Sequence, residues 1–347
     1  MTIRLLGSLG RSIIESGIAI VLGLAVGALF MLAFGYNPVR GYVTLFAGAF
    51  GTSSGILETL AFATPLMATA ITFAVGVRAS LFNIGAEGQM YLGAIGATII
   101  GGAVLLPPGI HLIAATACGM LFGALWALPA AVLKIWRGVH EVVSTIMLNW
   151  IAFWFVTFLV RTFFGDPERA ERALPAMASS RYQVIGETLT TVIFVVLVFC
   201  IAITVVLWRT GVGFELRLVG NNPDAAKYAG ASISRAILVS FLLGGLAAGL
   251  AGASQVLGRP PSWTLYATLG NILNLGFDGI GVALIGRNHP IGGVAASIFY
   301  GGLLNGGRYM EYNVGVSSEL VMAINGIIVI ALAIPEILTI IRRRRQP

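Results

Sequence analysis

The side chains best placed to do chemistry in this sequence lie in two short segments that resemble each other. Each segment contains Asn, Gly, an acid and Gly at the same offsets, and each precedes an apolar, glycine-rich run; the segments are Asn83–Gly88 and Asn274–Gly279. A carboxylate among apolar residues can accept hydrogen bonds from backbone N–H groups where a helix is interrupted. We therefore interpret Glu87 and Asp278 as organisers of broken helices, with ordinary helix caps as the alternative.

The remaining polar residues do not form a recognisable reactive site. The three histidines lack metal-ligand spacing, and no Ser/His/Asp set is visible in the sequence. With only two lysines, Lys134 and Lys227, the chain lacks a phosphate-binding loop that ends in Lys-Ser or Lys-Thr. Cys118 and Cys200 both fall inside apolar runs, which indicates small apolar side chains and not a disulfide. We expect no catalytic residue, no metal site and no cofactor on this chain.

The composition of the chain is apolar, and it predicts the kind of secondary structure that positions these residues. Of 347 residues, 57% are apolar and 10% are charged, and the mean hydropathy is +0.92. A soluble chain carries about 25% charged residues, so this composition excludes a soluble enzyme, a nucleic-acid binder and a secreted disulfide scaffold. The net charge of +7 does not indicate nucleic acid, because the cations lie in short loops and at the C-terminus. The sequence predicts an all-α polytopic membrane protein in contact with lipid.

Hydrophobic runs bounded by charges or prolines predict about ten transmembrane helices. A bilayer core about 30 Å thick needs ~20 apolar residues per helix. The predicted spans cover about 13–34, 56–77, 89–106, 110–133, 142–163, 189–208, 236–257, 270–286, 291–306 and 319–338. Two small-residue pairs, Gly23 with Gly27 and Gly245 with Gly249, have the spacing that lets helices pack closely.

A polar stretch from Gly165 to Glu187 separates two halves of five spans each. The halves cover about 1–165 and 188–341 of a single membrane domain, 1–347. An odd number of spans per half inverts the second half relative to the first, as in many transporters with discontinuous helices. Cations in alternate loops number fourteen on the side of the N-terminus and seven on the other. This bias predicts that both termini are cytoplasmic.

The predicted cytoplasmic loop 209–235 carries a short helix of its own. An Asn-Asn-Pro sequence at 221–223 can supply its cap and first turn, and Gly230 can end it. A transporter that takes energy from a separate motor needs a rigid element that carries movement into its spans. We interpret the helix, 223–229, as a docking element, with a plain connecting loop as the alternative.

Four groups of motifs identify a family resemblance. They are Phe82-Asn-Ile-Gly-Ala-Glu-Gly-Gln89; Arg217-Leu-Val-Gly-Asn221 with Ala225-Ala226 and Tyr228-Ala-Gly230; Gly276-Phe-Asp-Gly279 with Val282-Ala-Leu-Ile-Gly286 and His289-Pro290; and Glu141-Val142 with Ser144-Thr145 and Met147-Leu-Asn149. Together they resemble permease subunits in the nucleoside and simple-sugar branch of bacterial ATP-binding-cassette importers, a branch related to the ribose and branched-chain amino-acid permeases. The resemblance extends from about Ile56 to Asn305. His140 departs from it, because many members have Asn there.

The resemblance implies ATP-driven, inward transport of nucleosides, or of simple sugars, across a bacterial cytoplasmic (inner) membrane. A second permease subunit, often a different gene product and otherwise a copy of this chain, completes the pathway. Cytoplasmic ATPase subunits bind ATP and Mg²⁺ and dock on the inner loops, and an extracytoplasmic binding protein delivers the substrate. The permease itself does no covalent chemistry and alternates between outward-open and inward-open states.

The candidate site residues fall into two groups. For the substrate pathway or its supporting shell, they are Asn83, Glu87, Gln89, Asn149, Asn274 and Asp278. For coupling to the ATPase, they are Arg217, Asn221, Asn222, Asp224, Ala226 and Lys227. The outer stretch 165–187 is a candidate contact for the binding protein, although its mixed charge equally fits a solvated loop.

Other classes of membrane protein remain as alternatives. An ion-coupled secondary transporter also uses inverted five-span repeats and broken helices, and Glu58, Glu87 and Asp278 would then form its ion site. An intramembrane enzyme would need catalytic residues clustered at one depth, and none are evident in the sequence. A channel is compatible with the composition but not with the motifs.

Overall fold

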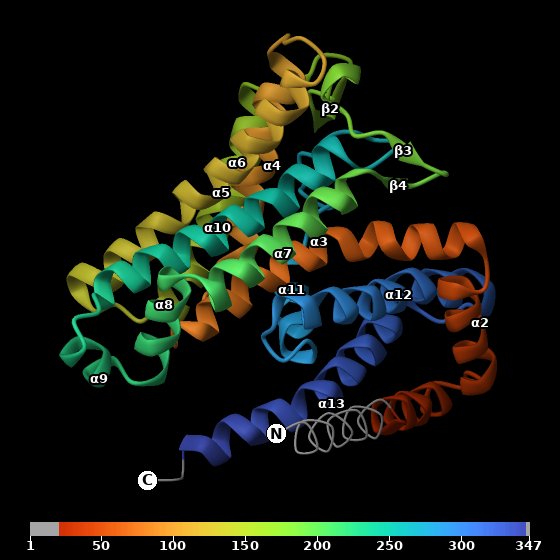
Figure 1. Ribbon diagram of the computed structural model, residues 1–347. Helices are drawn as coiled ribbons and strands as arrows, with labels where there is room; N and C mark the ends of the chain where they lie inside the picture. The colour runs from red at the N-terminus through yellow and green to blue at the C-terminus, as the bar shows by residue number, and fades with distance from the viewer. Residues whose placement is uncertain (1–20, 345–347) are drawn as a thin grey trace. The chain divides into compact units, whose positions relative to one another are not determined.

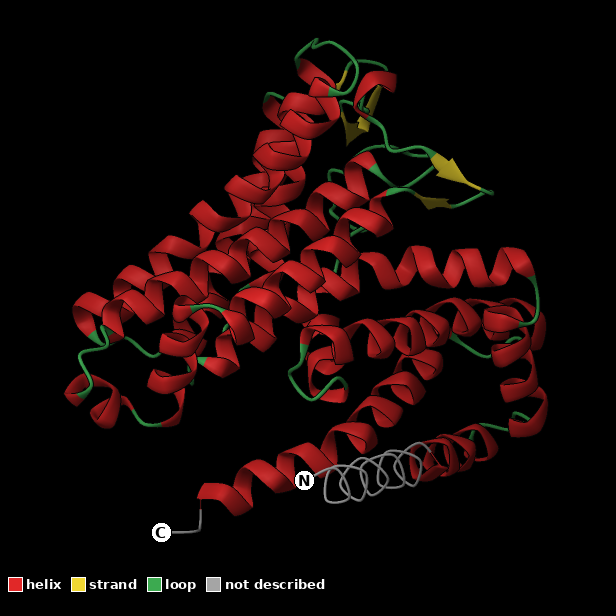
Figure 2. Cartoon of the chain, viewed as in Figure 1, coloured by secondary structure: helices red, strands yellow, loops and turns green. Residues whose placement is uncertain are grey.

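The computed structural model describes residues 21–344, with side chains as far as Ala331, and helices dominate it (Figures 1 and 2). The chain divides into two compact units. The smaller unit combines Met1–Thr59 with Phe299–Pro347, and the larger unit is Leu60–Ile298. Both boundaries fall inside long helices, α3 (Ser53–Arg78) and α12 (Pro290–Val314), so each of these helices contributes to both units.

The larger unit is built from long helices around a buried centre. Besides α3 from Leu60 onward, they are α4 (Ala86–Ala103), α5 (Ile110–Arg137), α6 (Glu141–Thr162), α7 (Val192–Arg209) and α10 (Ile233–Leu257). α4, α5 and α10 pack against one another. The most apolar stretches of α3 and α10 are 83% and 72% buried, whereas those of α5, α6 and α7 are only 33% buried. α3 and α10 are therefore central, and α5, α6 and α7 keep large exposed faces.

Five described helices are long and apolar enough to cross a membrane, namely α3, α5, α6, α7 and α10. They correspond to the predicted spans 56–77, 110–133, 142–163, 189–208 and 236–257. The exposed face of α6 is apolar, since Trp150, Trp154 and Phe158 are each more than half exposed. Such a face is unfavourable in water and compatible with lipid. The fold is that of a polytopic membrane protein.

Glycines allow α4, α5 and α10 to approach at backbone distance. A Cβ atom added at Gly249 of α10 would overlap the carbonyl of Gly119 on α5, and one added at Gly245 would lie 2.6 Å from the Cα atom of Ala124. On α4, Gly93 faces the backbone of Gly249 in the same way. The close-packing role that the sequence predicted for Gly245 and Gly249 is confirmed.

The predicted continuous span 270–286 is wrong in form. Only α11 (Leu275–Ile285) is helical there, and eleven residues at 1.5 Å each extend about 16 Å, half of a 30 Å bilayer core. The preceding chain is irregular but buried at Leu265, Leu269 and Ile272. Hydropathy measures burial and not backbone conformation, so the sequence did not show that the helix begins only at Leu275. α11 is a half-length helix, in keeping with the expectation of broken helices.

Two small hairpins contradict the all-α prediction. β1 (Gly165–Asp166) pairs antiparallel with β2 (Arg169–Ala173), and β3 (Val184–Ile185) pairs antiparallel with β4 (Leu189–Thr190); a 3₁₀ turn, η1 (Ala178–Ser180), lies between the hairpins. Strands of two to five residues are too short to show a clear alternating pattern in the sequence. In Figure 1 the strands lie at one end of the helices of the larger unit, opposite α8 (Gly211–Asn221) and α9 (Pro223–Tyr228).

The smaller unit contains an element that the sequence analysis missed. A helix over Val21–Ala33 is followed by α2 (Pro38–Phe50), which the predicted spans left as a loop. The side chain of Asn37 accepts a hydrogen bond from the N–H of Arg40, and Pro38 occupies the first turn. At 13 residues, α2 is too short to register as a span.

The C-terminal helices of the smaller unit are longer than predicted. α12 has 25 residues and α13 (Ser318–Arg344) has 27. Within this unit Gly23 and Gly27 pack against α13, since Cβ atoms there would meet Ile328 and Ile324. The predicted start of the first span, 13–20, and both chain ends lie outside the described residues.

The glycine interface predicts that two Gly→Ala substitutions have opposite effects on stability. Gly249→Ala should destabilise the protein by about 1–3 kcal/mol, because its methyl group has no space against Gly119. Gly326→Ala in α13 is the matched control, since nothing lies within 4 Å of its added Cβ and Ala favours a helix by ~0.5–1 kcal/mol. Thermal unfolding in detergent should show a lower midpoint for the first variant only. Equal midpoints would contradict the packing argument.

Candidate functional site

The two repeated polar segments meet at Glu87. This residue lies in the first turn of α4 and is only 2% exposed. Its carboxylate accepts hydrogen bonds from the backbone N–H groups of Asn274 and Gly276, each at 2.6 Å, and from the Tyr91 hydroxyl. Segments almost 190 residues apart in the chain are therefore joined by one side chain.

The start of α11 explains why these donors need an external acceptor. The first N–H groups of a helix have no partner within the helix. Asn274 occupies the cap position in a left-handed conformation, with φ of 69°, and its side chain makes no cap hydrogen bond. Glu87 supplies the missing acceptor, and the N-terminal dipoles of α4 and α11 both favour its negative charge. Gly276 is required for this approach, because a Cβ atom there would overlap the backbone of Glu87.

α3 holds the same end of α11 from another side. The Thr69 hydroxyl donates a hydrogen bond to the carbonyl of Leu275 at 3.0 Å. One turn further on, a Cβ atom at Gly279 would overlap Thr69. The N-terminus of α11 is thus fixed through its N–H groups by α4 and through a carbonyl by α3.

Buried amides fix the segment that leads into α4. Asn83 Oδ1 accepts hydrogen bonds from the N–H of Gly85 at 2.9 Å and from Gln89 Nε2 at 3.2 Å. Asn149 of α6 accepts from the N–H of Gly88 and donates to the carbonyl of Ile84, both at 2.9 Å. Asn83, Gln89 and Asn149 are at most 5% exposed. Within the described part of the chain, Asn83 Nδ2 and Gln89 Oε1 have no hydrogen-bond partner.

The structure brings together four of the six predicted pathway side chains. Asn83, Glu87, Gln89 and Asn149 form one buried cluster, whereas Asn274 contributes its backbone and has an exposed side chain. Asp278 lies in the first turn of α11 and is partly exposed.

Sequence reasoning missed Thr69, Tyr91 and Gly276 as members of this cluster. Tyr91 lies one helical turn after Glu87, a spacing that could have indicated the contact. Thr69 contacts α11 from a distant part of the chain, and its position in the sequence carries no comparable signal.

The predicted docking helix is present as α9 (Pro223–Tyr228). Asn222 Oδ1 accepts a hydrogen bond from the N–H of Ala225 at 3.0 Å, which is the expected N-cap. Ala226 is fully buried, whereas Asp224 and Lys227 are exposed in its first and last turns. Tyr228, which belongs to one of the motifs of the family resemblance but not to the predicted coupling residues, is 95% exposed.

A second helix in the same loop, α8 (Gly211–Asn221), was not predicted. Arg217 lies within it and donates a hydrogen bond from Nε to the carbonyl of Gly213, and the exposed Asn221 ends it. Glu215 of α8 accepts a hydrogen bond from the N–H of Ser232, just beyond α9. This bond and the packing of α8 on α9 join the two short helices into one element.

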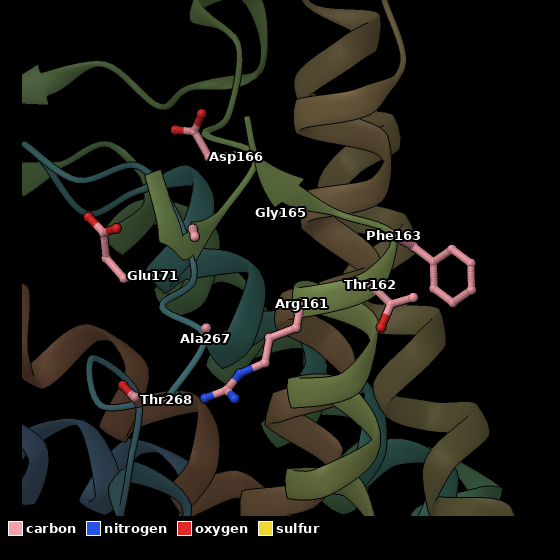
Figure 3. A pocket seen from close by; sticks show the side chains of 9 residues that line it. Arg161, Thr162, Phe163, Gly165, Asp166, Glu171, Ala267 and Thr268 are labelled. Carbon is pink, nitrogen blue, oxygen red and sulfur yellow. The ribbon is translucent and has the colours of Figure 1, made fainter. Parts of the chain in front are cut away.

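The opposite end of the larger unit carries two open cavities of about 550 and 510 Å³ that share Glu171 and Thr268. Figure 3 shows the larger one, with Arg161 reaching toward Ala267 and Thr268. The hairpin between the cavities is fixed by an ion pair of Asp166 with Arg172, 2.6 Å apart. The N–H of Glu168 and the Arg172 guanidinium both lower the pKa of the Asp166 carboxyl, so this acid is ionised at neutral pH.

The fold is that of a polytopic membrane protein, and a half-length helix whose start is joined to another helix is typical of transporters with discontinuous helices. The family model described as the permease component of the branched-chain amino acid transport system matches residues 55–333. The chain belongs to this family of permeases.

Individual relatives match almost the entire chain. It is 37% identical over 321 residues to the guanosine ABC transporter permease protein NupP of Bacillus subtilis, with 91% of each chain covered. It is 34% identical over 344 residues to the nucleoside ABC transporter permease protein NupB of Lactococcus lactis, covering 95% of this chain and 93% of NupB. It is 30% identical over 334 residues to the glucose ABC transporter permease protein TsgB13 of Haloferax volcanii, covering 92% and 86%. The predicted ABC permease is confirmed, and the ion-coupled alternative loses its support.

The hydrogen bonds from the N–H groups of Asn274 and Gly276 to Glu87, here called the Glu87 clamp, lead to a prediction. Glu87→Ala removes the acceptor from the buried N–H of Gly276 and the partly buried N–H of Asn274 and should destabilise the protein by about 3 kcal/mol or more. Glu87→Gln keeps one acceptor oxygen but turns an NH₂ group toward the other donor, so its loss should be smaller. Glu187→Ala, at an exposed glutamate, is the control. Thermal unfolding should rank the variants in this order, and an unchanged midpoint for Glu87→Ala would show that α11 does not depend on the clamp.

Proposed function

We propose that this chain is the membrane-spanning subunit of an ABC importer that takes up nucleosides, with simple sugars as the neighbouring substrate class. The observation that carries the proposal is the similarity to the guanosine and nucleoside permeases over more than nine tenths of the chain. The chain is less similar to the glucose permease, so sugars are the second proposed substrate class. A sugar ring is the chemical group common to these substrates.

The proposed architecture has about ten spans in two inverted halves, with a single permease domain over 1–347. α4 and α11, which begin within the two repeated segments, are the discontinuous helices of this arrangement. We assign Asn83, Glu87, Gln89, Asn149, Asn274 and Asp278 to the pathway or to the shell that supports it. The unpaired donor of Asn83 and acceptor of Gln89 support this assignment, because buried polar groups are costly unless a partner such as a polar substrate or water completes them.

Energy for transport comes, in this proposal, from a separate cytoplasmic ATPase that binds ATP and Mg²⁺, and this chain holds no cofactor of its own. The ATPase docks on α9 and the adjoining part of α8, where Arg217, Asn221, Asn222, Asp224 and Lys227 contact it and Ala226 supports the helix from beneath. This role is supported by the burial pattern of α9. Ala226 packs the helix against the rest of the protein, while the opposite, charged face of the helix is accessible to a partner. The exposed Tyr228 belongs to the same surface.

The remaining partners occupy other surfaces. A second permease subunit, most simply a related gene product, completes the pathway, and lipid surrounds the pair. An extracytoplasmic binding protein docks on the hairpin end, where Arg161, Arg169 and Glu171 border two open cavities. The excess of cations in alternate loops supports the assignment of both termini to the cytoplasmic side of a bacterial inner membrane.

The proposed mechanism is alternating access without covalent chemistry. ATP binding and hydrolysis change the relative free energies of outward-open and inward-open states, and the permease responds only as far as its contacts differ between them. Glu87 keeps the start of α11 joined to α4, so that the two helices move as a unit around the pathway.

Transport assays and co-purification test this function. A tagged chain isolated from native membranes should bring along an ATPase with a phosphate-binding loop, and mass spectrometry should identify the second permease. Vesicles containing that complex and its binding protein should accumulate labelled guanosine when ATP is present. Uptake that persists without ATP but collapses with the proton gradient would contradict the proposal, and uptake of glucose alone would assign the second substrate class.

The docking assignment predicts the effect of a proline in α9. Ala226→Pro removes the N–H that bonds to the carbonyl of Asn222 and breaks the short helix, so uptake should be abolished while the protein stays inserted. Ala225→Ser, at the exposed neighbouring position, is the control and should transport normally. Normal uptake by the proline variant would remove α9 from the docking surface.

A further inference from the structure

Arg78, the last residue of α3, links several elements at the α9 end of the larger unit. Its guanidinium donates hydrogen bonds to the carbonyl of Asn288, from Nη2 at 2.9 Å and from Nε at 3.3 Å. Asn288 lies in the tight turn between α11 and α12. A side chain from α3 therefore holds a turn that lies about 210 residues further along the chain.

The turn needs such a contact because its backbone is strained. Arg287 and Asn288 have φ angles of 55° and 52°, a left-handed conformation that asparagine adopts readily but that costs an ordinary L-residue such as Arg287 roughly 1–2 kcal/mol. Such strain persists only where the surroundings impose it. The Arg78 guanidinium donates to the Asn288 carbonyl, whose direction is set by this conformation. The position of the guanidinium and the shape of the turn therefore depend on each other.

An aromatic side chain from α7 completes the contact. The guanidinium carbon of Arg78 lies 5.2 Å from the centroid of the Trp208 ring, and that ring lies 4.5 Å from the ring of His289. His289 Nδ1 accepts a hydrogen bond from the N–H of Ile291 and so caps α12. Burial and the nearby Arg78 lower the pKa of His289, so the imidazole is neutral at pH 7 and can lie beside the cation.

The proposed docking element touches Arg78 directly. A Cβ atom at Gly220, near the end of α8, would overlap the carbonyl of Arg78, so α8 packs at backbone distance on the end of α3. The other end of α8 is equally close to α7, since a Cβ atom at Gly213 would overlap the carbonyls of Val206 and Leu207. Movement of α8 therefore displaces the end of α3 or the end of α7, and both carry groups that hold the turn.

We propose that Arg78 is the positioning residue that transmits displacement of α8 and α9 to the turn between α11 and α12. This inference rests on the proposed function, in which α9 receives the ATPase. Arg78 binds the turn through two nitrogens and lies over the Trp208 ring at a cation–π distance, and a lysine ammonium cannot reproduce this two-nitrogen contact together with the ring contact. α11 is held at its other end by Glu87, so a displacement of the turn reaches the pathway cluster through a helix of eleven residues.

The test compares Arg78→Ala and Arg78→Lys in the complete complex reconstituted in vesicles with its binding protein. Both variants should keep the ATPase bound and its basal hydrolysis within twofold of wild type. Uptake per ATP hydrolysed should fall at least tenfold for Arg78→Ala and several-fold for Arg78→Lys. Arg137→Ala, at an exposed arginine in the last turn of α5, should change neither quantity. Uptake and hydrolysis that fall in parallel, or uptake that is unaffected, would overturn the proposal.

A distance measurement separates this proposal from the substrate assignment. Spin labels at Phe214→Cys on α8 and Ile291→Cys at the start of α12, with Cys118 and Cys200 replaced by alanine, report on both ends of the link. ATP should change the label distance in the otherwise wild-type complex, and Arg78→Ala should abolish that change. If no nucleoside is transported but the change still depends on Arg78, only the substrate assignment fails. A change that survives Arg78→Ala rejects the proposed link, whatever the substrate.

A milder substitution distinguishes a role in coupling from a role in folding. Trp208→Phe keeps an aromatic ring beside Arg78 and His289 but weakens the cation–π contact, and it should lower uptake per ATP by about twofold to fivefold with an unchanged unfolding midpoint. If every variant at Arg78 and Trp208 lowers the unfolding midpoint and the ATPase rate together, the residues act in folding alone and the proposal is wrong.

Discussion

The larger unit depends on one buried carboxylate that faces two helix N-termini. Glu87 lies in the first turn of α4, and its oxygens accept the backbone N–H groups at the start of α11. A charge this far from water is costly when isolated, and the unpaired donors of a helix start are costly for the same reason. Each group supplies what the other lacks, so a half-length helix can end inside the protein.

This interaction constrains the residues around it. Gly276 and Gly279 have no side chains because α4 and α3 occupy that space, and Asn149 holds the backbone of α4 at Gly88 so that the carboxylate meets its donors. The two repeated segments are consequently contact partners with different roles. The first segment contributes a side chain, and the second contributes backbone N–H groups. The repeated motif therefore encodes an interface between the two segments.

α11 connects the two regions on which the proposed transport cycle depends. Its first residues join α4 and α3 at the polar cluster, and the turn that follows it lies beside Arg78 and Trp208. A helix about 16 Å long is stiff over its length. The position of one end therefore constrains the other, which is how an event at the α8–α9 surface can alter the polar cluster without a change in covalent structure.

The sequence by itself determined the membrane class, five of the long helices and the short helix at Pro223, because composition, hydropathy and local capping are properties of neighbouring residues. Its motifs identified the permease family by resemblance. It also indicated Glu87, since an acid among apolar residues needs a partner. Only the tertiary structure decided that the partner is the backbone of Asn274 and Gly276 and that Thr69 and Arg78 hold the two ends of α11. It also decided that the chain before α11 is irregular and yet buried at Leu265, Leu269 and Ile272. These outcomes depend on contacts between segments far apart in the chain, and hydropathy records whether a residue avoids water but not which segment covers it.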